Sequence, residues 1–265
     1  MIKKIINRWK KTSGFVEPTI PNPRDSDIYL VSYPKSGNTW MRYLLAYAIW
    51  PEINKPDLEE MAGLIPSYGL EYDIKSMLDP ATPCNKLEHR IIKEHFPYNN
   101  VAKKYVKNVI YLCRDGRDAI ISYWHFLNQV RGTSVSLNDF IRDSSSHPSG
   151  PWHDHVQQWL DAPVNKLVIR YEDMLNNPAS SLKMVLDFIK LERDELIINR
   201  AVERSSFDSM KAIEKSKGFR LDMLKNVDFI RQGEAGSWKT LFDNKTIQLF
   251  REYHGTGINS LDYKW

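Results

Sequence analysis

Short apolar runs alternate along this chain with longer segments whose apolar positions recur at helical spacing. The run at 28–32 has the length and continuity of a buried strand, and the helical pattern over 39–50 that follows it stops before Pro51. The same grammar returns at 109–113 and 118–130. This repetition predicts two strand–helix units.

Further elements extend the alternation. Strands are expected at 167–171 and, more briefly, at 90–93. A helix over 177 to about 191 opens with Asn at its cap and Pro in its first turn. Asp243 is suited to cap a late helix that we expect to end near Gly255.

Strands that are continuously apolar and separated by helices predict an α/β fold with a central parallel sheet flanked by helices. The length of 265 residues fits one domain over 1–265, with a lead-in at 1–24 and a core at 25–250. Ligands of such sheets bind at the carboxyl ends of the strands, and the most unusual loops of this chain all follow strands.

Composition narrows the class of protein. A net charge of +4 is too weak to indicate nucleic acid, although it suits an anionic small ligand. Cys84 and Cys113 lie far apart, which favours a reducing, cytoplasmic location. No apolar run reaches the roughly 18 residues of a membrane span. The basic, amphipathic stretch 1–9 is expected to dock on the domain as a helix, rather than to lie on a membrane surface.

The loop 33–40, Tyr-Pro-Lys-Ser-Gly-Asn-Thr-Trp, joins a predicted strand to a predicted helix. Unpaired amides and the positive end of the helix dipole favour an anion there, and Gly37 lets the backbone approach it closely. The loop is not a Walker motif, because the first Gly is missing and Lys35 precedes the Gly. These features predict a phosphate site of another type.

The octapeptide 33–40 resembles the Y-P-K-S-G-T-T-W loop of the sulfotransferases that use 3′-phosphoadenosine-5′-phosphosulfate (PAPS) and release adenosine-3′,5′-bisphosphate (PAP). The resemblance implies a P-loop-like nucleotide-binding core in which Lys35 binds the 5′-phosphosulfate and its bridging oxygen. It also implies that Trp40 packs near the adenine. The residues implied to cradle the 5′ phosphate are Ser36, Gly37, Asn38 and Thr39, of which Asn38 replaces the usual Thr.

The segment 109–118 and the helix after it resemble a second signature of the same family, a strand that ends in Arg and is followed by R-D-x-x-x-S-x-x-x-F. The resemblance assigns Arg114 and Ser122 to the 3′ phosphate, and an Arg at a strand end can bind a phosphate with two hydrogen bonds. We interpret Arg117 and Asp118 as a local ion pair in the first turn of the helix.

Lys93-Glu-His95-Phe-Pro resembles the K-x-H-x-P segment of the family, which makes His95 the general base and Lys93 a second cation for the transition state. An acceptor hydroxyl is a poor nucleophile until a base takes its proton, and a lysine stabilises the charge that grows on the leaving phosphate oxygen. The sulfuryl group carries less charge than a phosphoryl group, so lysines can replace Mg²⁺ and no metal is expected. His153 and His155 have no evident third metal ligand; His155 matches a family segment that borders the acceptor pocket.

The C-terminal part contains further matches. The segment 229–239 resembles R-K-G-x-x-G-D-W-K, which implies that Arg231 and Gly233 hold the 3′ phosphate, with Gln232 in place of the usual Lys. The residues implied to contact the adenine are Ser205, Phe207 and Tyr171. Residues 239–248 stand where the family has its dimer motif but do not match it, so the oligomeric state stays open.

The sequence therefore predicts a PAPS-dependent sulfotransferase with a small-molecule acceptor and no nucleic-acid partner. The alternatives are an ATP-dependent kinase of the P-loop type and a non-catalytic nucleotide-binding protein. Aromatic side chains in roughly residues 60–90 and 124–155, the part of the chain least like any family signature, favour a hydrophobic alcohol or phenol as acceptor. The residues expected to line its pocket are Tyr68, Tyr72, Trp124, His125, Phe126 and Trp152.

Overall fold

The computed structural model describes residues 22–67, 71–98, 105–143, 149–217, 227 and 230–265. The helix expected at 1–9 lies outside the described residues. Cys84 and Cys113 are both free and buried. Among the described residues, no helix is both long enough and apolar enough to cross a membrane.

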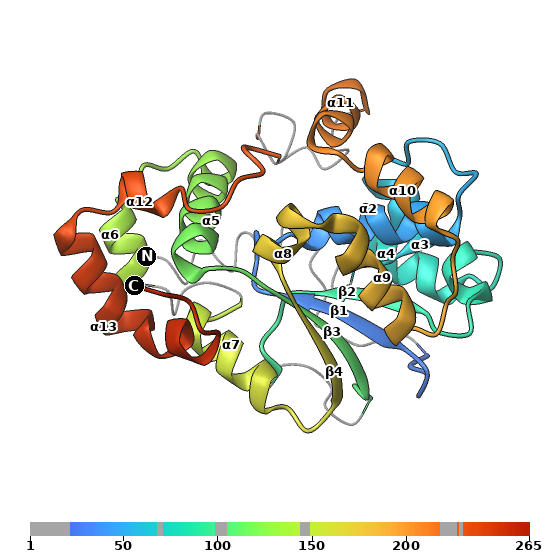
Figure 1. Cartoon of the computed structure of the whole chain (residues 1–265), viewed down its shortest axis with the longest axis horizontal. Helices are drawn as coiled ribbons and strands as arrows, with labels where there is room; N and C mark the ends of the chain where they lie inside the picture. Colours follow the sequence, from blue (N-terminus) through green and yellow to red (C-terminus); the bar gives the residue numbers. More distant parts are fainter. Residues whose placement is uncertain (1–21, 68–70, 99–104, 144–148, 218–226, 228–229) are drawn as a thin grey trace.

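Four parallel strands form the central sheet, in the order β2-β1-β3-β4. Their bounds are β1 (Ile28–Ser32), β2 (Ile91–Glu94), β3 (Asn108–Cys113) and β4 (Asn165–Arg170). The predicted α/β class and parallel sheet are confirmed, because each apolar run forms a strand that helices cover on both sides (Figure 1). The bounds of β2, β3 and β4 differ from the prediction by one or two residues, and Tyr171 starts the next helix rather than ending β4.

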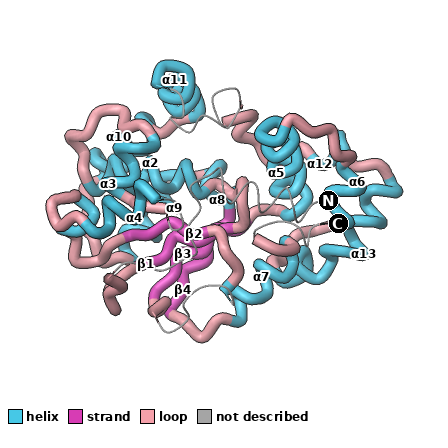
Figure 2. Tube along the Cα trace, turned by 180° about the vertical axis from the view of Figure 1, so that it is seen from behind, coloured by secondary structure: helices cyan, strands magenta, loops and turns pink. Residues whose placement is uncertain are grey.

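Alternate residues of each strand enter two different hydrophobic cores. Leu30 and Ile110 belong to the core on one face of the sheet, whereas Val31 and Tyr111 belong to the core on the other. Figure 2 shows the strands between the two groups of helices. The sheet is therefore the middle layer of three; β1, β2 and β3 are largely buried on both faces, whereas β4 at the edge is partly exposed.

The helices divide between the two faces. The first group contains α2 (Asn38–Ile49), α3 (Leu58–Leu64), α8 (Tyr171–Asn176), α9 (Pro178–Phe188), α10 (Glu195–Arg204) and α11 (Phe207–Lys217). The second contains α5 (Gly116–Arg131), α6 (Leu137–Arg142), α7 (Trp152–Asp161), α12 (Trp238–Leu241) and α13 (Asn244–Ser260). The remaining helix, α4 (Glu71–Leu78), contacts both α3 and the 3₁₀ turn η1 (Pro83–Lys86).

The predicted helix caps are confirmed, but the predicted end of α13 is wrong. Asn177 accepts a hydrogen bond from the Ser180 amide at 3.0 Å, and Asp243 accepts one from the Thr246 amide at 2.7 Å. The last helix nevertheless continues through Gly255 to Ser260. At Gly257, a Cβ atom would lie 2.6 Å from the Trp152 ring, so this glycine serves close packing inside the helix.

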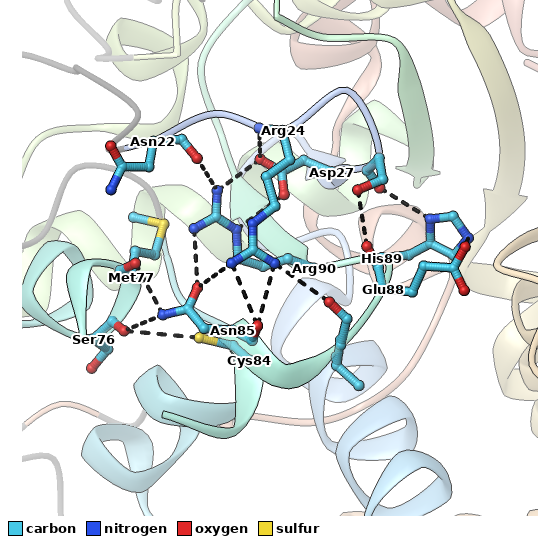
Figure 3. Close-up of polar contacts among 12 residues, drawn as sticks. Asn22, Arg24, Asp27, Ser76, Met77, Cys84, Asn85, Glu88, His89 and Arg90 are labelled. Carbon is cyan, nitrogen blue, oxygen red and sulfur yellow. Dashed lines mark hydrogen bonds and ion pairs between the residues drawn. The ribbon is translucent and has the colours of Figure 1, made fainter. Parts of the chain in front are cut away.

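A buried polar network anchors the start of β1 to the start of β2, at the amino ends of the strands (Figure 3). Arg90 and Asp27 form a fully buried ion pair at 2.8 Å, and Arg24 bonds the carbonyl of Asn85. These contacts fix the chain before β1 at the amino ends of the strands. The candidate site residues lie at the opposite, carboxyl ends.

Candidate functional site

Each of the four strands delivers a predicted site residue just beyond its carboxyl end. Lys35 follows β1, His95 follows β2, Arg114 follows β3 and Tyr171 follows β4. Because the strands are parallel, these residues meet at one edge of the sheet. Motifs that are far apart in the sequence therefore lie together in a single site.

The loop after β1 has the backbone of an anion cradle. Gly37 precedes α2 with φ of +91°, and a Cβ there would lie 2.7 Å from the ring of Tyr171. The first turn of α2 has no acidic side chain, so the positive end of its dipole is uncompensated. The hydroxyl of Ser36 is fully buried and has no hydrogen-bond partner among the described residues. A buried donor of this kind fits an anionic ligand at the loop.

Lys35 occupies the left-handed region at φ of +68°, which is strained for a lysine. The guanidinium of Arg114 donates to its carbonyl at 2.9 Å and holds this conformation. Burial and the charge of Arg114 lower the pKa of Lys35 to about 7, while Glu214 opposes the shift. The ammonium lies 4.9 Å from the centre of the Phe126 ring. Such a crowded cation is suited to a negatively charged partner.

The side chain of Asn38 points away from the cradle, contrary to the simplest form of the prediction. Its amide donates to the Leu30 carbonyl at 3.1 Å and to the Ser32 hydroxyl at 3.2 Å, both in β1. Only its backbone amide is placed to serve the loop. Thr39 is half-buried in the first turn of α2.

The ring of His95 is fixed in one tautomer by the end of β1. Its Nδ1 lies 2.8 Å from the Ser32 carbonyl and 3.2 Å from the Ser32 hydroxyl. A carbonyl oxygen can only accept, so Nδ1 carries the proton and Nε2 carries the lone pair. Burial and the charge of Lys93 hold the pKa of His95 well below its usual value. The ring is therefore neutral at neutral pH and can accept a proton.

Lys93 lies beside this base, with its ammonium 3.3 Å from the Ser67 hydroxyl. Burial and the charge of Arg42 lower the pKa of Lys93 to about 8, whereas Asp73 and Glu94 raise it. The charge of Lys93 acts on both His95 and Lys35, so a neutral histidine and two lysines of lowered pKa belong to one electrostatic cluster, which is typical of acid–base and electrostatic catalysis.

Glu94 is a site residue that the sequence prediction missed. Its carboxyl group accepts hydrogen bonds from the backbone amides of His95 at 2.6 Å and Phe96 at 2.7 Å. These two bonds shape the turn that directs His95, and burial raises the pKa of Glu94 to about 8. The available signal was a carboxylate between the two catalytic candidates, at the end of a buried strand.

Arg114 joins three of the predicted loops. Besides the Lys35 carbonyl, it binds the carbonyl of Glu234 at 2.7 Å. Its guanidinium lies 4.4 Å from the centre of the Tyr171 ring, and that ring meets Trp40 edge-on at 6.1 Å. The structure therefore brings together the residues predicted for the phosphates and the adenine.

Arg231 completes the cationic cluster. Burial and the charge of Arg114 lower the pKa of Arg231, as expected when two guanidinium groups are neighbours. Gly233 has φ of +68°, and a Cβ there would lie 2.7 Å from the ring of Phe207. Gln232 is exposed beside it. The cluster concentrates positive charge at the strand ends, where an anion would neutralise it.

Two residues predicted to contact the nucleotide, Ser122 and Ser205, are buried. Ser122 is buried on α5. Ser205 is fully buried, and its hydroxyl donates to the Ala201 carbonyl at 2.7 Å, at the end of α10. Its proton is therefore used by the helix, which leaves only its lone pairs for a ligand.

The predicted ion pair between Arg117 and Asp118 is wrong. Arg117 makes a two-pronged pair with Asp115, at 2.9 Å and 2.7 Å, because Asp115 is the N-cap of α5 and Arg117 lies in its first turn. Asp118 instead accepts hydrogen bonds from Gly236, Ser237 and Trp238.

The two histidines of α7 have different neighbours. His153 lies 3.1 Å from His254, measured between Nδ1 atoms, and 3.1 Å from the carboxylate of Asp154. His155 is fully buried, and its Nδ1 lies 3.1 Å from the hydroxyl of Tyr111. Burial lowers the pKa of His155 to about 3, so the ring stays neutral.

The predicted acceptor pocket is only partly supported by residue positions. Phe126 and Trp124 are half-buried on α5, and of the two Phe126 is the residue whose ring lies against the Lys35 ammonium. Trp152 is only 1% exposed and packs against Phe250, so it belongs to the core. His125 is half-buried, and burial and the charge of Arg231 lower its pKa. Tyr68 and the side chain of Tyr72 lie outside the described residues.

Comparison with known families gives one match, "Sulfotransferase domain", over residues 25–260. Sulfotransferase 1 family member D1 of Mus musculus is 28% identical over 94% of this chain and 86% of its own length. Flavonol 3-sulfotransferase of Flaveria bidentis is 29% identical over 84% of this chain and 78% of its own.

Solved structures give the same result for the fold. A mouse sulfotransferase complexed with PAP has a TM-score of 0.65 and 25% identity, covering 91% of this chain and 90% of its own. Retinol dehydratase in complex with androsterone and PAP has a TM-score of 0.67 and 23% identity, covering 93% of this chain and 84% of its own.

Proposed function

This chain belongs to the sulfotransferase family and transfers a sulfuryl group from PAPS to a small acceptor, and we propose that His95, Lys35 and Lys93 carry out that transfer. The observation that supports these roles most strongly is a neutral His95 ring held in one tautomer, with Lys93 acting on both this ring and Lys35. In this arrangement a base and the cations for a leaving phosphate lie at one sheet edge.

The proposed reaction is an in-line displacement at sulfur. The acceptor hydroxyl gives its proton to Nε2 of His95 while its oxygen forms a bond to the sulfur of PAPS. The bond between that sulfur and the phosphate oxygen breaks, and PAP leaves with the electron pair. Lys35 stabilises the charge on that oxygen, and Lys93 adds a second positive charge nearby.

The donor site that we propose uses the ends of β1, β3 and β4, whereas the end of β2 supplies the base. Lys35, with Ser36, Gly37, Thr39 and the backbone amide of Asn38, holds the 5′ phosphosulfate. Arg114, Ser122, Arg231, Gln232 and Gly233 bind the 3′ phosphate, and Trp40, Tyr171, Ser205 and Phe207 surround the adenine. Support comes from the bonds of Arg114 to the loops of Lys35 and Glu234, which bring the phosphate-binding segments together. No step requires a metal ion.

The ATP-dependent kinase is not favoured, since the family match is to sulfotransferases. A thermal-shift titration tests the choice directly with PAP, ATP and ATP–Mg²⁺. A ligand at 100 times its Kd adds about 2.7 kcal/mol of stability, which for a chain of this size raises Tm by roughly 5–10 °C. A shift with PAP alone supports the proposal, and a larger shift with ATP–Mg²⁺ would reverse it.

For the acceptor we propose a hydrophobic alcohol or phenol. Phe126 on α5 places an aromatic ring against the Lys35 ammonium, and Trp124 is a second half-buried aromatic residue of the same helix. A relative is named for a flavonol, and a structural neighbour was solved with androsterone. A screen of alcohols, phenols and amines with labelled PAPS tests this class; preferential labelling of a polar amine would contradict it.

We also propose a cellular location for the protein. The free cysteines and a relative named cytosolic sulfotransferase support a cytoplasmic location. We also propose one domain over 1–265, with its core at 25–250. Its oligomeric state is a separate question, because residues 239–248 depart from the family's dimer motif.

A further inference from the structure

A buried carboxylate at the start of α5 holds the C-terminal segment by three hydrogen bonds. One oxygen of Asp118 accepts from the Gly236 amide at 2.5 Å. The other accepts from the Ser237 hydroxyl and the Trp238 amide, both at 2.9 Å. Asp118 is only 1% exposed, so the accepting carboxylate is shielded from water, while its three donors are half-buried.

The segment that Asp118 holds is continuous with the loop predicted to bind the 3′ phosphate. Arg231 and Gly233 lie a few residues before Gly236. The carbonyl of Glu234, which lies between Gly233 and Gly236, accepts a hydrogen bond from Arg114 at 2.7 Å. Two residues from the β3–α5 connection therefore hold the loop by hydrogen bonds: Arg114, just after β3, and Asp118, in the first turn of α5.

Arg117 also contacts the segment 236–238 that Asp118 holds. Its guanidinium lies 3.7 Å from the centre of the Trp238 ring and donates to the Lys264 carbonyl at 2.6 Å. The two-pronged pair with Asp115 fixes its orientation. Trp238 is therefore held through both its backbone amide and its ring, which limits the positions that the loop before it can adopt.

The charge of Asp118 is unfavourable for what this loop is proposed to do. A carboxylate near a phosphate site repels the ligand, and Asp118 is close enough to Arg231 to counteract the lowering of its pKa. A residue present only as background charge would therefore weaken nucleotide binding. The hydrogen bonds act in the opposite direction, since they order the loop before the ligand arrives.

We propose that Asp118 is a positioning residue for the donor nucleotide, which holds 236–238 so that Arg231 and Gly233 face the 3′ phosphate. This inference rests on the proposed donor site. It makes recognition of the 3′ phosphate depend on a side chain that does not touch the nucleotide.

Asp118→Asn separates positioning from charge, because the two effects have opposite signs. An amide has one accepting oxygen and one donating nitrogen, so in either orientation its NH₂ group faces at least one donor of 236–238. We expect the Kd of PAP to rise about tenfold, while the Kd of AMP, which lacks the 3′ phosphate, changes less than about twofold. Calorimetric titration of both nucleotides gives the ratio of PAP affinity to AMP affinity (the PAP/AMP ratio), which this change should lower and which a general loss of stability would not change.

Asp243→Asn is the matched control. It removes the same charge from a helix cap, at a residue outside the proposed site, and Asn is also a good cap. The PAP/AMP ratio of this variant should equal that of the wild type.

Tighter or unchanged PAP binding by Asp118→Asn would overturn the proposal. If that variant does not fold, Ser237→Ala removes one of the three bonds, and it should lower the PAP/AMP ratio about threefold; an unchanged ratio would equally overturn it. Wild-type protein that binds PAP no better than AMP would instead contradict the proposed donor site itself, which distinguishes the two failures.

Discussion

Removal of the His95 ring is the most direct test of the mechanism. In His95→Ala the acceptor hydroxyl loses the only group proposed to take its proton, so kcat should fall by about 10²–10⁴. At about 1.36 kcal/mol per decade, this corresponds to roughly 2.7–5.4 kcal/mol of activation free energy. The Kd of PAP should stay within about twofold, because the ring is held by Ser32 and does not belong to the phosphate loops.

The assay combines initial rates at saturating PAPS with a titration of PAP. His89→Ala is a suitable control, because His89 also lies near a backbone carbonyl, that of Ser26 at 3.2 Å, but at the opposite edge of the sheet (Figure 3). Near wild-type turnover in His95→Ala would remove this residue from the mechanism. A parallel loss of PAP binding would show that the ring supports the donor site instead.

The pH profile of the wild type belongs to the same experiment. The pKa of His95 lies well below 6.5, so the base stays neutral and no acid limb is expected near that pH. Lys35 and Lys93 have pKa values of about 7 and about 8. They lose their charge as the pH rises through these values, so kcat/KM, which reports the free enzyme, should fall above about pH 7–8. Bound nucleotide anion raises both pKa values, so the fall in kcat should begin at higher pH.

Three other changes test the donor site. Lys35→Met should lower kcat by roughly 10²–10³ and PAPS affinity by less, since the charge on the bridging oxygen grows in the transition state; steady-state kinetics would contradict this if only KM changed. PAP should bind far more tightly than AMP, because charged hydrogen bonds from Arg114 and Arg231 contribute about 1.5–3 kcal/mol each, and equal affinities in calorimetry would refute both assignments. Gln232→Lys should strengthen PAP binding by about 1 kcal/mol at low salt and by less at high salt; an unchanged Kd at low salt would mean that residue 232 points away from the nucleotide.

Much of the fold could be predicted because local patterns and sheet geometry agree. Continuous apolar runs such as 109–113 have to be buried on both faces, which only a parallel sheet between helices provides. The position of the site at the strand ends followed from the same geometry. The end of α13 could not be predicted, because Gly257 fits closely against Trp152, a residue about a hundred positions earlier.

Partner choice within the site was also beyond the sequence. Spacing allows Arg117 to pair with Asp115 or Asp118, and only the position of the C-terminal segment decides between them. Asp118 is taken by three donors from 236–238, so the guanidinium turns to Asp115. The burial of Glu94 likewise depends on packing around β2, and its spacing from Lys93 and His95 carries no sign of it.

Asn38 links the anion-binding side of the site to its acid–base side. The usual Thr of the family has one donor, whereas the Asn38 amide reaches both the Leu30 carbonyl and the Ser32 hydroxyl. That hydroxyl and the Ser32 carbonyl together face Nδ1 of His95. A residue in the first turn of α2 therefore helps to hold the strand end that fixes the tautomer of the base. Since the same turn offers its backbone amides to the donor phosphate, the position of the nucleotide and the direction of Nε2 depend on one short piece of chain, 32–38.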